Sequence, residues 1–501
     1  MDRTTITRAP GYPGCAALLL LVPLFVGVAT WAVRPRALDP LVVTVAVVAA
    51  ALAAHELRVR RPSLLFLLGV RLGAGRTRLV VATRTFELYR LADAIEAASR
   101  IAARVDALHV EAEVSSTSAY PNNSLEDVLR RWPWINLAPI RPATRVAVDV
   151  GYRVQRLVAS DQFWIAPGAQ GDGARVVRVR TQPYSNQVLV EVACATAPLA
   201  EAALAEIVRL ADAHSVYRGK RLAVKFETGE VDDFGLIQKG TEVLSFLPDE
   251  PVAKDEVILP DRTWALIERA VFDAARKREA LAALGVPAKR GLLFHGPPGT
   301  GKTLTCRYIA SALAGTTTLV ATGHALTHIG SICRLARMLQ PSLVLLEDVD
   351  LAYAAREINQ FSTALGELMD ALDGLAPEEA VIFLLTTNSI ERLEKAIADR
   401  PGRITQCVYF GPPAPELRHR YLARHLAGCD ASRLDLERVV ALTEGESQAY
   451  LKELVHRALQ VCLDDPARAA TATLVDQDFA TAHAELKDDG RCAEVVGFGR
   501  R

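Results

Sequence analysis

The chain has 501 residues, half of them apolar, which is enough for two or three folded domains with sizeable cores. Its 58 lysines and arginines balance 58 acidic residues, and no basic run interleaved with aromatic residues occurs, so the charge pattern does not favour a nucleic-acid partner. The eight cysteines contain no C-x-x-C pair, which argues against a zinc ribbon or a disulfide framework.

The N-terminal region contains a long uncharged segment, residues 11–33 (GYPGCAALLLLVPLFVGVATWAV). As a helix it would extend about 35 Å, enough for a hydrocarbon layer of about 30 Å, so we expect a membrane span. A cleaved secretory signal is the alternative, because Arg3 and Arg8 precede the apolar run. Against that alternative, the run is long for a signal peptide and a second apolar stretch follows it.

The second apolar stretch, residues 41–54, would extend only about 21 Å as a helix. We expect one of three arrangements: the stretch completes a hairpin with the first helix, lies in the membrane interface, or packs on the first helix. Arg58, Arg60 and Arg61 follow, and the positive-inside tendency then places the rest of the chain in the cytoplasm. The sequence predicts a single- or double-pass protein of the cell membrane, in contact with lipid, anchored by residues 1–62.

The next part of the chain, residues 63–250, shows no catalytic signature. Helical periodicity occurs at residues 86–105 and 198–215, and strand-like patterns occur at residues 145–152, 174–180, 187–195 and 221–227. We expect one α+β domain, which serves either as a module for a partner or substrate or as a spacer. Trp132 and Trp134 fit a buried core or a membrane-proximal aromatic patch.

The segment FHGPPGTGKTLT, residues 294–305, fits the phosphate-binding pattern G-x-x-x-x-G-K-[ST]. In this pattern backbone N–H groups face the phosphates, Lys302 reaches the β- and γ-oxygens, and the Thr303 hydroxyl ligates Mg2+. A strand predicted at residues 291–295 precedes the loop and a helix predicted from Leu304 follows, so the loop opens onto a helix N-terminus, which favours anions. The residues expected to bind ATP here are Gly296, Pro297, Pro298, Gly299, Thr300, Gly301, Lys302, Thr303 and Leu304.

Two further apolar runs end in polar residues. Residues 341–350 (PSLVLLEDVD) predict a buried strand that ends in acids, with Glu347 expected to hold Mg2+ and Asp348 to polarise the attacking water. Residues 381–388 (VIFLLTTN) predict another buried strand, after which Asn388 is expected to hydrogen-bond the γ-phosphate or that water.

Arg400 and Arg403 flank a Pro-Gly turn in the segment ADRPGRITQ. Two arginines on a stiff turn are suited to reach the γ-phosphate of a neighbouring subunit. Arginine fingers of this kind contribute about 10^3 to 10^5 in rate in phosphoryl transfer. The pattern therefore predicts self-association.

The motifs GPPGTGKT, LLEDVD, LLTTN and RPGR, in this order and spacing, resemble those of the AAA ATPases of the classical clade, over residues 257–487. The resemblance implies an α/β fold: a P-loop AAA core with a five-stranded parallel sheet in residues 251–411, a small helical lid in residues 412–487, and a tail at 488–501. It implies strands at residues 291–295, 316–320, 343–347, 381–386 and 406–410. It also implies ATP and Mg2+ as cofactors, a ring that is a hexamer or heptamer, and an unidentified protein substrate.

In the lid, the segment LTEGESQAYLKELV resembles the family's second sensor region, which implies that Gln448 and Ala449 approach the nucleotide. The same segment half-matches a hydrolase G-x-S-x-G turn. It lacks the last glycine and a preceding strand, so Ser447 is not expected to be a nucleophile.

Within the clade, the order of membrane anchor, middle domain and ATPase, together with the Glu-Asp order in LLEDVD, is most similar to the mitochondrial membrane-anchored translocase that moves the Rieske iron-sulfur subunit. Most members of the clade have Asp-Glu, so here the expected base is shorter by one methylene. Peptide-threading members carry an aromatic pore loop, whereas the corresponding His328-Ile329-Gly330 lacks an aromatic.

Two functions fit these features. The first is a membrane-anchored ring ATPase that hydrolyses ATP at subunit interfaces to remodel or translocate protein partners. The second is a membrane-tethered ATP-binding switch or scaffold with little turnover. An ATPase that acts on DNA fits less well, because of the predicted anchor and the neutral charge.

Overall fold

The computed structural model describes residues 68, 71–72, 78–114, 124–130, 140–166, 176–182, 186–227, 241–284, 286, 290–350, 379–391 and 404–495. The two predicted membrane segments, Trp132, Trp134, Arg400 and Arg403 lie outside the described residues. Within the described part of the chain, no helix is both long enough and apolar enough to span a membrane. The chain divides into two compact units, Met1–Val216 and Tyr217–Arg501.

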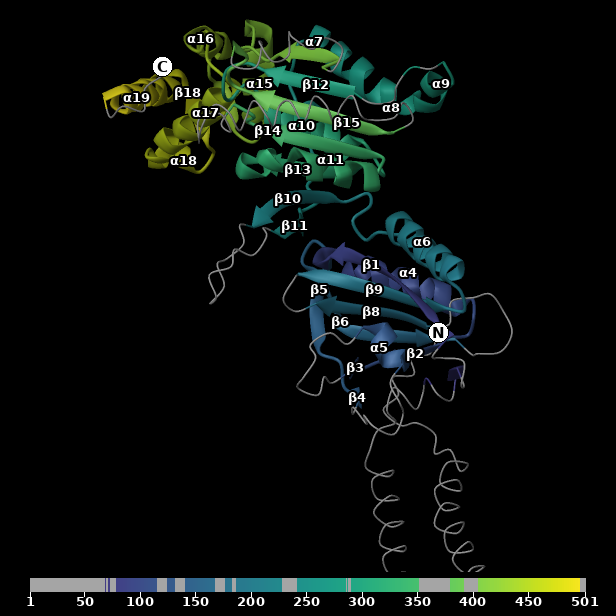
Figure 1. The fold of residues 1–501 in the computed structure, drawn as a ribbon. Coiled ribbons are helices and arrows are strands. Elements are labelled where there is room, and N and C mark those ends of the chain that lie inside the picture. Colours follow the sequence, from purple (N-terminus) through teal and green to yellow (C-terminus); the bar gives the residue numbers. More distant parts are fainter. Residues whose placement is uncertain are drawn as a thin grey trace, which may run out of the picture. The chain divides into compact units, whose positions relative to one another are not determined.

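The first unit is built on a five-stranded antiparallel sheet in the order β1-β9-β8-β7-β2 (Figure 1). Its strands are β1 (Val80–Glu87), β2 (Leu108–Glu111), β7 (Asp161–Ile165), β8 (Val176–Gln182) and β9 (Gln187–Cys194). Two separate strand pairs are β3 (Glu113–Val114) with β4 (Ile140–Arg141), and β5 (Arg145–Gly151) with β6 (Val154–Ala159). The helices are η2 (Leu88–Arg90), α4 (Leu91–Ala103), α5 (Leu125–Arg130) and α6 (Ala197–Ala213).

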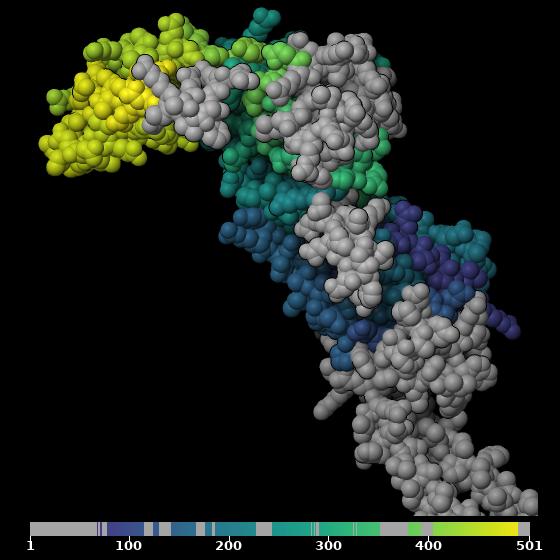
Figure 2. Space-filling view, turned by 60° about the vertical axis from the view of Figure 1, so that its left-hand side comes forward, coloured from purple at the N-terminus to yellow at the C-terminus, as the bar shows by residue number. Residues whose placement is uncertain are grey.

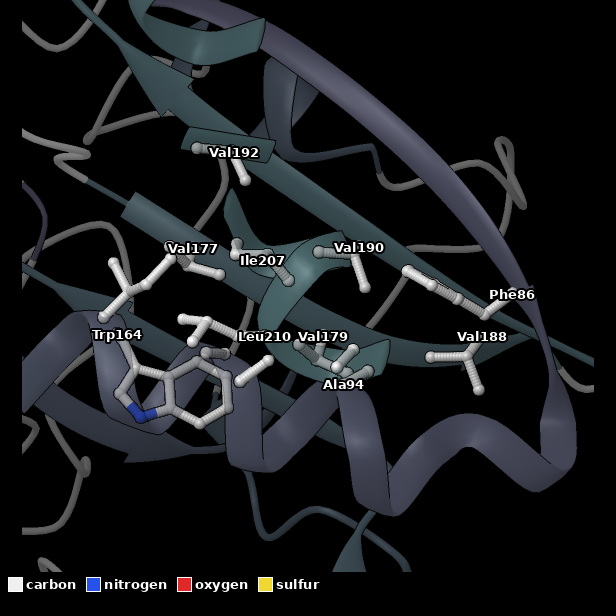
Figure 3. Packing of buried hydrophobic residues seen from close by; sticks show 14 of the residues in the cluster. Phe86, Ala94, Trp164, Val177, Val179, Val188, Val190, Val192, Ile207 and Leu210 are labelled. Carbon is white, nitrogen blue, oxygen red and sulfur yellow. The ribbon is translucent and has the colours of Figure 1, made fainter. Parts of the chain in front are cut away.

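Helices cover both faces of this sheet, which is why every residue of β7 is buried. On one face, Trp164 lies in the same apolar cluster as Ile207 and Leu210 of α6 (Figure 3). On the other face, Leu125 of α5 packs in a cluster with Phe163. Alternate residues of a strand point to opposite faces, so β7 serves both cores. The helices and antiparallel strands agree with the α+β expectation for this part of the chain.

The second unit contains a seven-stranded sheet in the order β11-β10-β13-β14-β15-β12-β16. All neighbouring strands from β10 to β16 pair parallel, and β11 pairs antiparallel with β10. The strands are β10 (Arg221–Glu227), β11 (Thr241–Phe246), β12 (Arg290–His295), β13 (Thr317–Thr322), β14 (Ser342–Glu347), β15 (Val381–Thr387) and β16 (Gln406–Tyr409). The helices are η3 (Lys254–Glu256), α7 (Asp261–Ile267), the π-helical η4 (Glu268–Asp273), α8 (Ala274–Arg276), α9 (Arg278–Ala283), α10 (Lys302–Ala312), η5 (Gly323–His328) and α11 (Ile329–Met338).

The five predicted parallel strands are confirmed as β12 to β16, and two strands extend the sheet beyond them. The segment 221–227 is a strand, as predicted, but Arg221 to Ala223 pair with Thr318 to Val320 of the seven-stranded sheet. Because β10 and β11 belong to this sheet, the second unit begins before the expected boundary at residue 250. The predicted helix at 86–105 is also shorter, because residues 86 and 87 complete β1 against β9.

The C-terminal part of the second unit is a mostly helical subdomain at the place of the predicted lid, and it is called the lid below. It consists of α15 (Pro415–His425), α16 (Leu436–Leu442), α17 (Gln448–Leu463), α18 (Pro466–Ala469) and α19 (Asp476–Val495), with β17 (Asp430–Arg433) and β18 (Thr473–Val475) as a short parallel pair. In Figure 2 the yellow-green and yellow end of the chain forms one rounded lobe. The last helix runs to Val495, past the expected end at 487. Ile258, which precedes α7, is buried in the core of this lid.

Candidate nucleotide site

The predicted phosphate loop, the two predicted acids and Asn388 lie at the ends of three neighbouring parallel strands, β12, β14 and β15 (Figure 1). Parallel strands end at the same edge of a sheet, and ligands of open α/β sheets bind outside that edge. The loop after β12 begins at Gly296, Glu347 ends β14, and Asn388 follows β15. The fold therefore brings together segments that lie far apart in the sequence.

The loop from Gly296 to Gly301 needs its glycines for both backbone conformation and space. Gly296, Gly299 and Gly301 have φ values of 142°, 75° and 93°, a region that other residues rarely adopt. A Cβ on Gly296 would lie 2.0 Å from the carbonyl oxygen of Phe410. Gly301 is the N-cap of α10, so the loop delivers the chain directly to a helix N-terminus, as predicted.

Lys302 is buried inside this loop. Its ammonium donates to the carbonyl oxygens of Gly296 at 2.7 Å and Pro297 at 2.8 Å. Burial lowers the pKa of the Lys302 ammonium, while the negative charges of Asp348 and Asp350 act in the opposite direction. The lysine thus places a positive charge at the centre of the loop, close to the acids that follow β14.

Thr303 and Glu347 lie together beside the start of α10. The Thr303 side chain is exposed, and its hydroxyl is close enough to the Glu347 carboxylate to lower the pKa of that carboxyl. Burial and the charge of Asp348 raise the pKa of the Glu347 carboxyl, while Arg307 and the Thr303 hydroxyl act in the opposite direction. A hydroxyl and a carboxylate oxygen are the protein ligands that Mg2+ uses next to phosphates.

Asp348 faces Asn388 rather than Thr303. The side-chain amide of Asn388 donates to Asp348 Oδ1 at 3.3 Å. Asp348 has a φ of 48°, in the left-handed region, and its backbone N–H donates to the hydroxyl of Thr386 at 2.9 Å. The two acids therefore differ in their surroundings: Glu347 lies with the Thr303 hydroxyl, which is predicted to bind the metal, and Asp348 lies with the side-chain amide of Asn388.

The lid contributes Gln448 and Ala449 to the same loop. The Ala449 N–H donates to the carbonyl oxygen of Gly299 at 3.0 Å. Gln448 is buried, donates to the carbonyl oxygen of Ile258 at 2.8 Å, and has Oε1 only 2.7 Å from the place of a Cβ on Gly301. Both residues therefore lie against the phosphate loop, and their approach to a nucleotide stays a prediction.

Ser447 has a structural role that fits its rejection as a nucleophile. Its hydroxyl accepts the Tyr450 N–H at 3.3 Å and caps α17. The remaining predicted loop residues differ in burial: Thr300 is buried and donates to the Pro297 carbonyl at 2.9 Å, Leu304 packs on the core under the sheet, and Pro298 is exposed.

The segment at residues 328–330 corresponds to the pore loop of peptide-threading members, but its central residue is not exposed. Ile329 is 2% exposed and begins α11. His328 is exposed and stacks on Phe226 of β10, with ring centroids 4.1 Å apart. The aromatic residue beside this position comes from a distant part of the chain, which the local sequence did not indicate.

Sequence reasoning missed several residues of the site. Thr386, Asp350 and Ile258 hydrogen-bond predicted site residues, and the Thr387 hydroxyl donates to Asp350. Asp350 belongs to the acidic run that was singled out, but nothing local distinguishes a buried acid from an exposed one. The contact of Ile258 depends on the lid folding back onto the loop.

The donor set of the site fits ATP and Mg2+. Three glycines leave space along the loop, and the loop ends at the N-terminus of α10, which favours anions. The buried ammonium of Lys302 lies within the loop. The Thr303 hydroxyl and the Glu347 carboxylate supply hard oxygen ligands. These features match the needs of a triphosphate and its cation.

Comparison with known proteins agrees with this geometry. Residues 292–412 match the sequence model of the ATPase family associated with various cellular activities (AAA). The matched range contains the loop, both acids and Asn388. It also contains Arg400 and Arg403.

Similar proteins occur among proteasome-related ATPases. The chain is 28% identical over 263 residues to the 26S proteasome regulatory subunit 8 homolog of Schizosaccharomyces pombe, covering 47% of this chain and 64% of that protein. It is 30% identical over 226 residues to the subunit 8 homolog B of Arabidopsis thaliana, covering 42% and 53%. The proteasome-activating nucleotidase of Methanopyrus kandleri is 26% identical over 265 residues, covering 49% and 60%. The chain thus spans less than two thirds of the length of these relatives.

Proposed function

From the AAA ATPase domain that this chain carries, we propose that the protein hydrolyses ATP with Mg2+ at the loop formed by residues 296–303. The observation that carries the proposal is the meeting of Lys302, two differently placed acids and Asn388 at one edge of a parallel sheet. Positioning and charge stabilisation are what phosphoryl transfer chiefly requires of a protein.

Each residue of the site has a defined task in this proposal. Lys302 exchanges its bonds to loop carbonyls for bonds to the β- and γ-phosphates. Thr303 and Glu347 would hold Mg2+, which would neutralise phosphate charge when bound. Asp348 accepts a proton from the attacking water, and Asn388 orients that water and holds Asp348.

We also propose a ring of subunits, which the resemblance to AAA ATPases supports. Arg400 and Arg403 are proposed to reach the nucleotide of a neighbouring subunit, so that each ATP lies at an interface of a hexamer or heptamer. Gln448 and Ala449 connect the lid to the loop, so a change at the phosphates is transmitted to α17.

The proposed work of the ring is to remodel or translocate protein partners. The names of the similar proteins, which describe proteasome regulation and activation, support a protein rather than a nucleic-acid partner. The proposed location is the cell membrane, on the strength of the uncharged segment at residues 11–33. The resemblance to the translocase of the Rieske subunit stays a prediction.

A membrane-tethered switch with little turnover is the second candidate. Two observations favour it: the shorter acid, Asp348, occupies the base position, and Ile329 is buried where a threading ATPase would display its pore loop. In this alternative the nucleotide state controls assembly rather than driving movement.

Steady-state ATP hydrolysis by the detergent-purified full chain, measured over a series of protein concentrations, separates the two. Asp348→Asn serves as the blank. A specific activity that rises steeply with concentration and disappears in the variant supports the ring ATPase. Tight ATP binding with turnover no higher than the variant supports the switch.

A further inference from the structure

Asp350 is a buried acid at the site that the roles above do not use. The residue is 5% exposed. Its Oδ1 atom accepts two hydrogen bonds, from the Thr387 hydroxyl at 2.9 Å and from the Asn388 backbone N–H at 3.0 Å. A single carboxylate oxygen of the loop after β14 therefore binds both the last residue of β15, Thr387, and the residue that follows it, Asn388.

The other two residues of the loop after β14, Asp348 and Val349, are also hydrogen-bonded to β15. The N–H of Asp348 donates to the Thr386 hydroxyl at 2.9 Å, and the N–H of Val349 donates to the Thr386 carbonyl at 3.0 Å. These bonds hold Asp348 in its left-handed conformation, which is unfavourable for a residue with a side chain. Three successive loop residues, Asp348, Val349 and Asp350, are therefore hydrogen-bonded to β15 or to the residue that follows it.

The consequence lies in the side chains that face the substrate. Asn388 Nδ2 donates to Asp348 Oδ1 at 3.3 Å, so the positions of both side chains depend on the hydrogen bonds between the loop and β15. The Thr387 hydroxyl also accepts the Ser389 N–H at 3.0 Å, which leaves its own hydrogen directed at Asp350. If Asp350 lost these bonds, Asn388 would be free to move relative to Asp348.

We propose that Asp350 is a positioning residue for ATP hydrolysis, which sets Asn388 and Asp348 at the distance needed to hold one water between them and the γ-phosphate. This inference rests on the proposed function of the site. Asp350 itself touches neither substrate nor water in this role. It acts through the two bonds to its Oδ1 atom.

The proposal distinguishes hydrogen bonding from charge. Both bonds end on one oxygen, and an asparagine carries an equivalent oxygen. Asp350→Asn therefore keeps the acceptor and removes the charge, whereas Asp350→Ala removes both. Thr387→Val removes the hydroxyl that donates to Asp350 and accepts the Ser389 N–H, while it conserves side-chain shape. It serves as a second variant should Asp350→Ala fail to fold.

The test compares these three variants with the wild-type full chain in kcat, KM for ATP and ATP dissociation constant. Asp350→Ala is expected to lower kcat by about 100-fold, the effect of a misplacement of roughly 1 Å in a catalytic group. Thr387→Val should lower kcat less, and Asp350→Asn should stay within about threefold of wild type, since the acceptor remains. The ATP dissociation constant should not rise in any of the three, because none of the altered groups touches the phosphate loop.

Hydrogen exchange of the Asn388 amide, measured without nucleotide, checks the bond itself. Protection should persist in Asp350→Asn and be lost in Asp350→Ala. If Asp350→Ala and Thr387→Val both keep wild-type kcat, the inference is overturned while the ATPase proposal stands. If Asp350→Asn falls as far as Asp350→Ala, or loses ATP affinity, the charge matters and positioning through hydrogen bonds is wrong. A wild-type chain without turnover overturns both.

Discussion

The backbone N–H of Ala449 donates to the carbonyl oxygen of Gly299 across 3.0 Å, so the first turn of a lid helix rests directly on the phosphate loop. The contact is close because Gly299 has no side chain: a Cβ there would lie 2.8 Å from Ala449 Cβ and 2.9 Å from Ser447 Oγ. The position of the lid and the shape of the loop are therefore coupled through one residue pair.

The first prediction concerns this coupling. Gly299→Ala should lower ATP affinity by about tenfold or more, since about 1.4 kcal/mol of interference corresponds to that factor. Gly315→Ala is the matched control, because Gly315 has a similar φ of 73° but nothing within 4 Å of a new Cβ. Both variants bear the strain of a left-handed alanine, and only the first meets the lid. Equal ATP affinities in the two variants, measured by titration calorimetry, would contradict the coupling.

Lys302→Ala should abolish ATP binding in practice, with a fall in affinity of about 100-fold or more. The ammonium would make charge-assisted bonds to two phosphates, each worth about 1.5–3 kcal/mol. Binding of a fluorescent ATP analogue measures the loss, and Lys277→Ala, an exposed lysine of the same unit, is the control. Normal affinity in Lys302→Ala would remove the phosphate-loop assignment.

The different surroundings of the two acids predict different defects. Asp348→Asn should bind ATP and Mg2+ normally but lower kcat by about 10^2 to 10^4, as expected for loss of a general base. Glu347→Gln should instead raise the Mg2+ concentration needed for half-maximal activity, because Glu347 lies with Thr303. Mg2+ titrations of both variants check this division. A reversed pattern would assign the base role to Glu347.

The raised pKa of the Glu347 carboxyl predicts the pH dependence of Mg2+ binding. Only the ionised carboxylate ligates the cation, so a raised pKa means that binding is lost at a higher pH than for an ordinary glutamate as the pH falls. The Arg307 charge opposes this shift of the pKa. Arg307→Gln should therefore raise the pKa further and move the acidic limb of the Mg2+ affinity to higher pH.

Glu250→Gln is the control for that experiment. Glu250 pairs with Arg307 at 2.8 Å, so the variant breaks the same ion pair but keeps the arginine charge. The acidic limb should not move to higher pH in this variant. An upward shift of the same size in both would mean that the ion pair, rather than the charge near Glu347, controls the profile.

The proposed arginine fingers predict complementation between subunits. Arg400→Ala should bind ATP but lose turnover, by about 10^3 or more if the finger acts as in other phosphoryl-transfer systems. Mixing Arg400→Ala subunits with Asp348→Asn subunits should restore part of the activity, because some interfaces then combine an intact acid with an intact finger. Mixtures of Arg400→Ala with Lys302→Ala should do the same. No recovery in either mixture would show that Arg400 does not act in trans.

Much of the ATPase fold was predictable because its signals are local. The strands that became β12, β14 and β15 are continuous apolar runs of the kind expected for strands buried on both faces. The partner of a strand is not a local property, however. Residues 221–227 alternate like any strand, and their parallel pairing with β13 depends on a segment almost a hundred positions later in the chain.

Some residues of the candidate site could likewise be predicted from local motifs, and others could not. Lys302, Thr303, Glu347 and Asn388 were predictable because a motif fixes their positions relative to strand ends. The role of Asp350 was not, since its value depends on burial against Thr387, across a sheet register that only the folded chain defines. The buried position of Ile329 likewise follows from where α11 begins, which the loop sequence does not specify.

The membership of β10 and β11 in the seven-stranded sheet matters to anyone who wishes to isolate the unit that carries the candidate nucleotide site. A fragment that begins at residue 251 would lack both strands and would leave β13 as a bare sheet edge. Unpaired backbone groups along an apolar edge strand invite pairing with other molecules, so such a fragment should aggregate. A cut near Val216 keeps the edge covered by the strands that cover it in the whole chain.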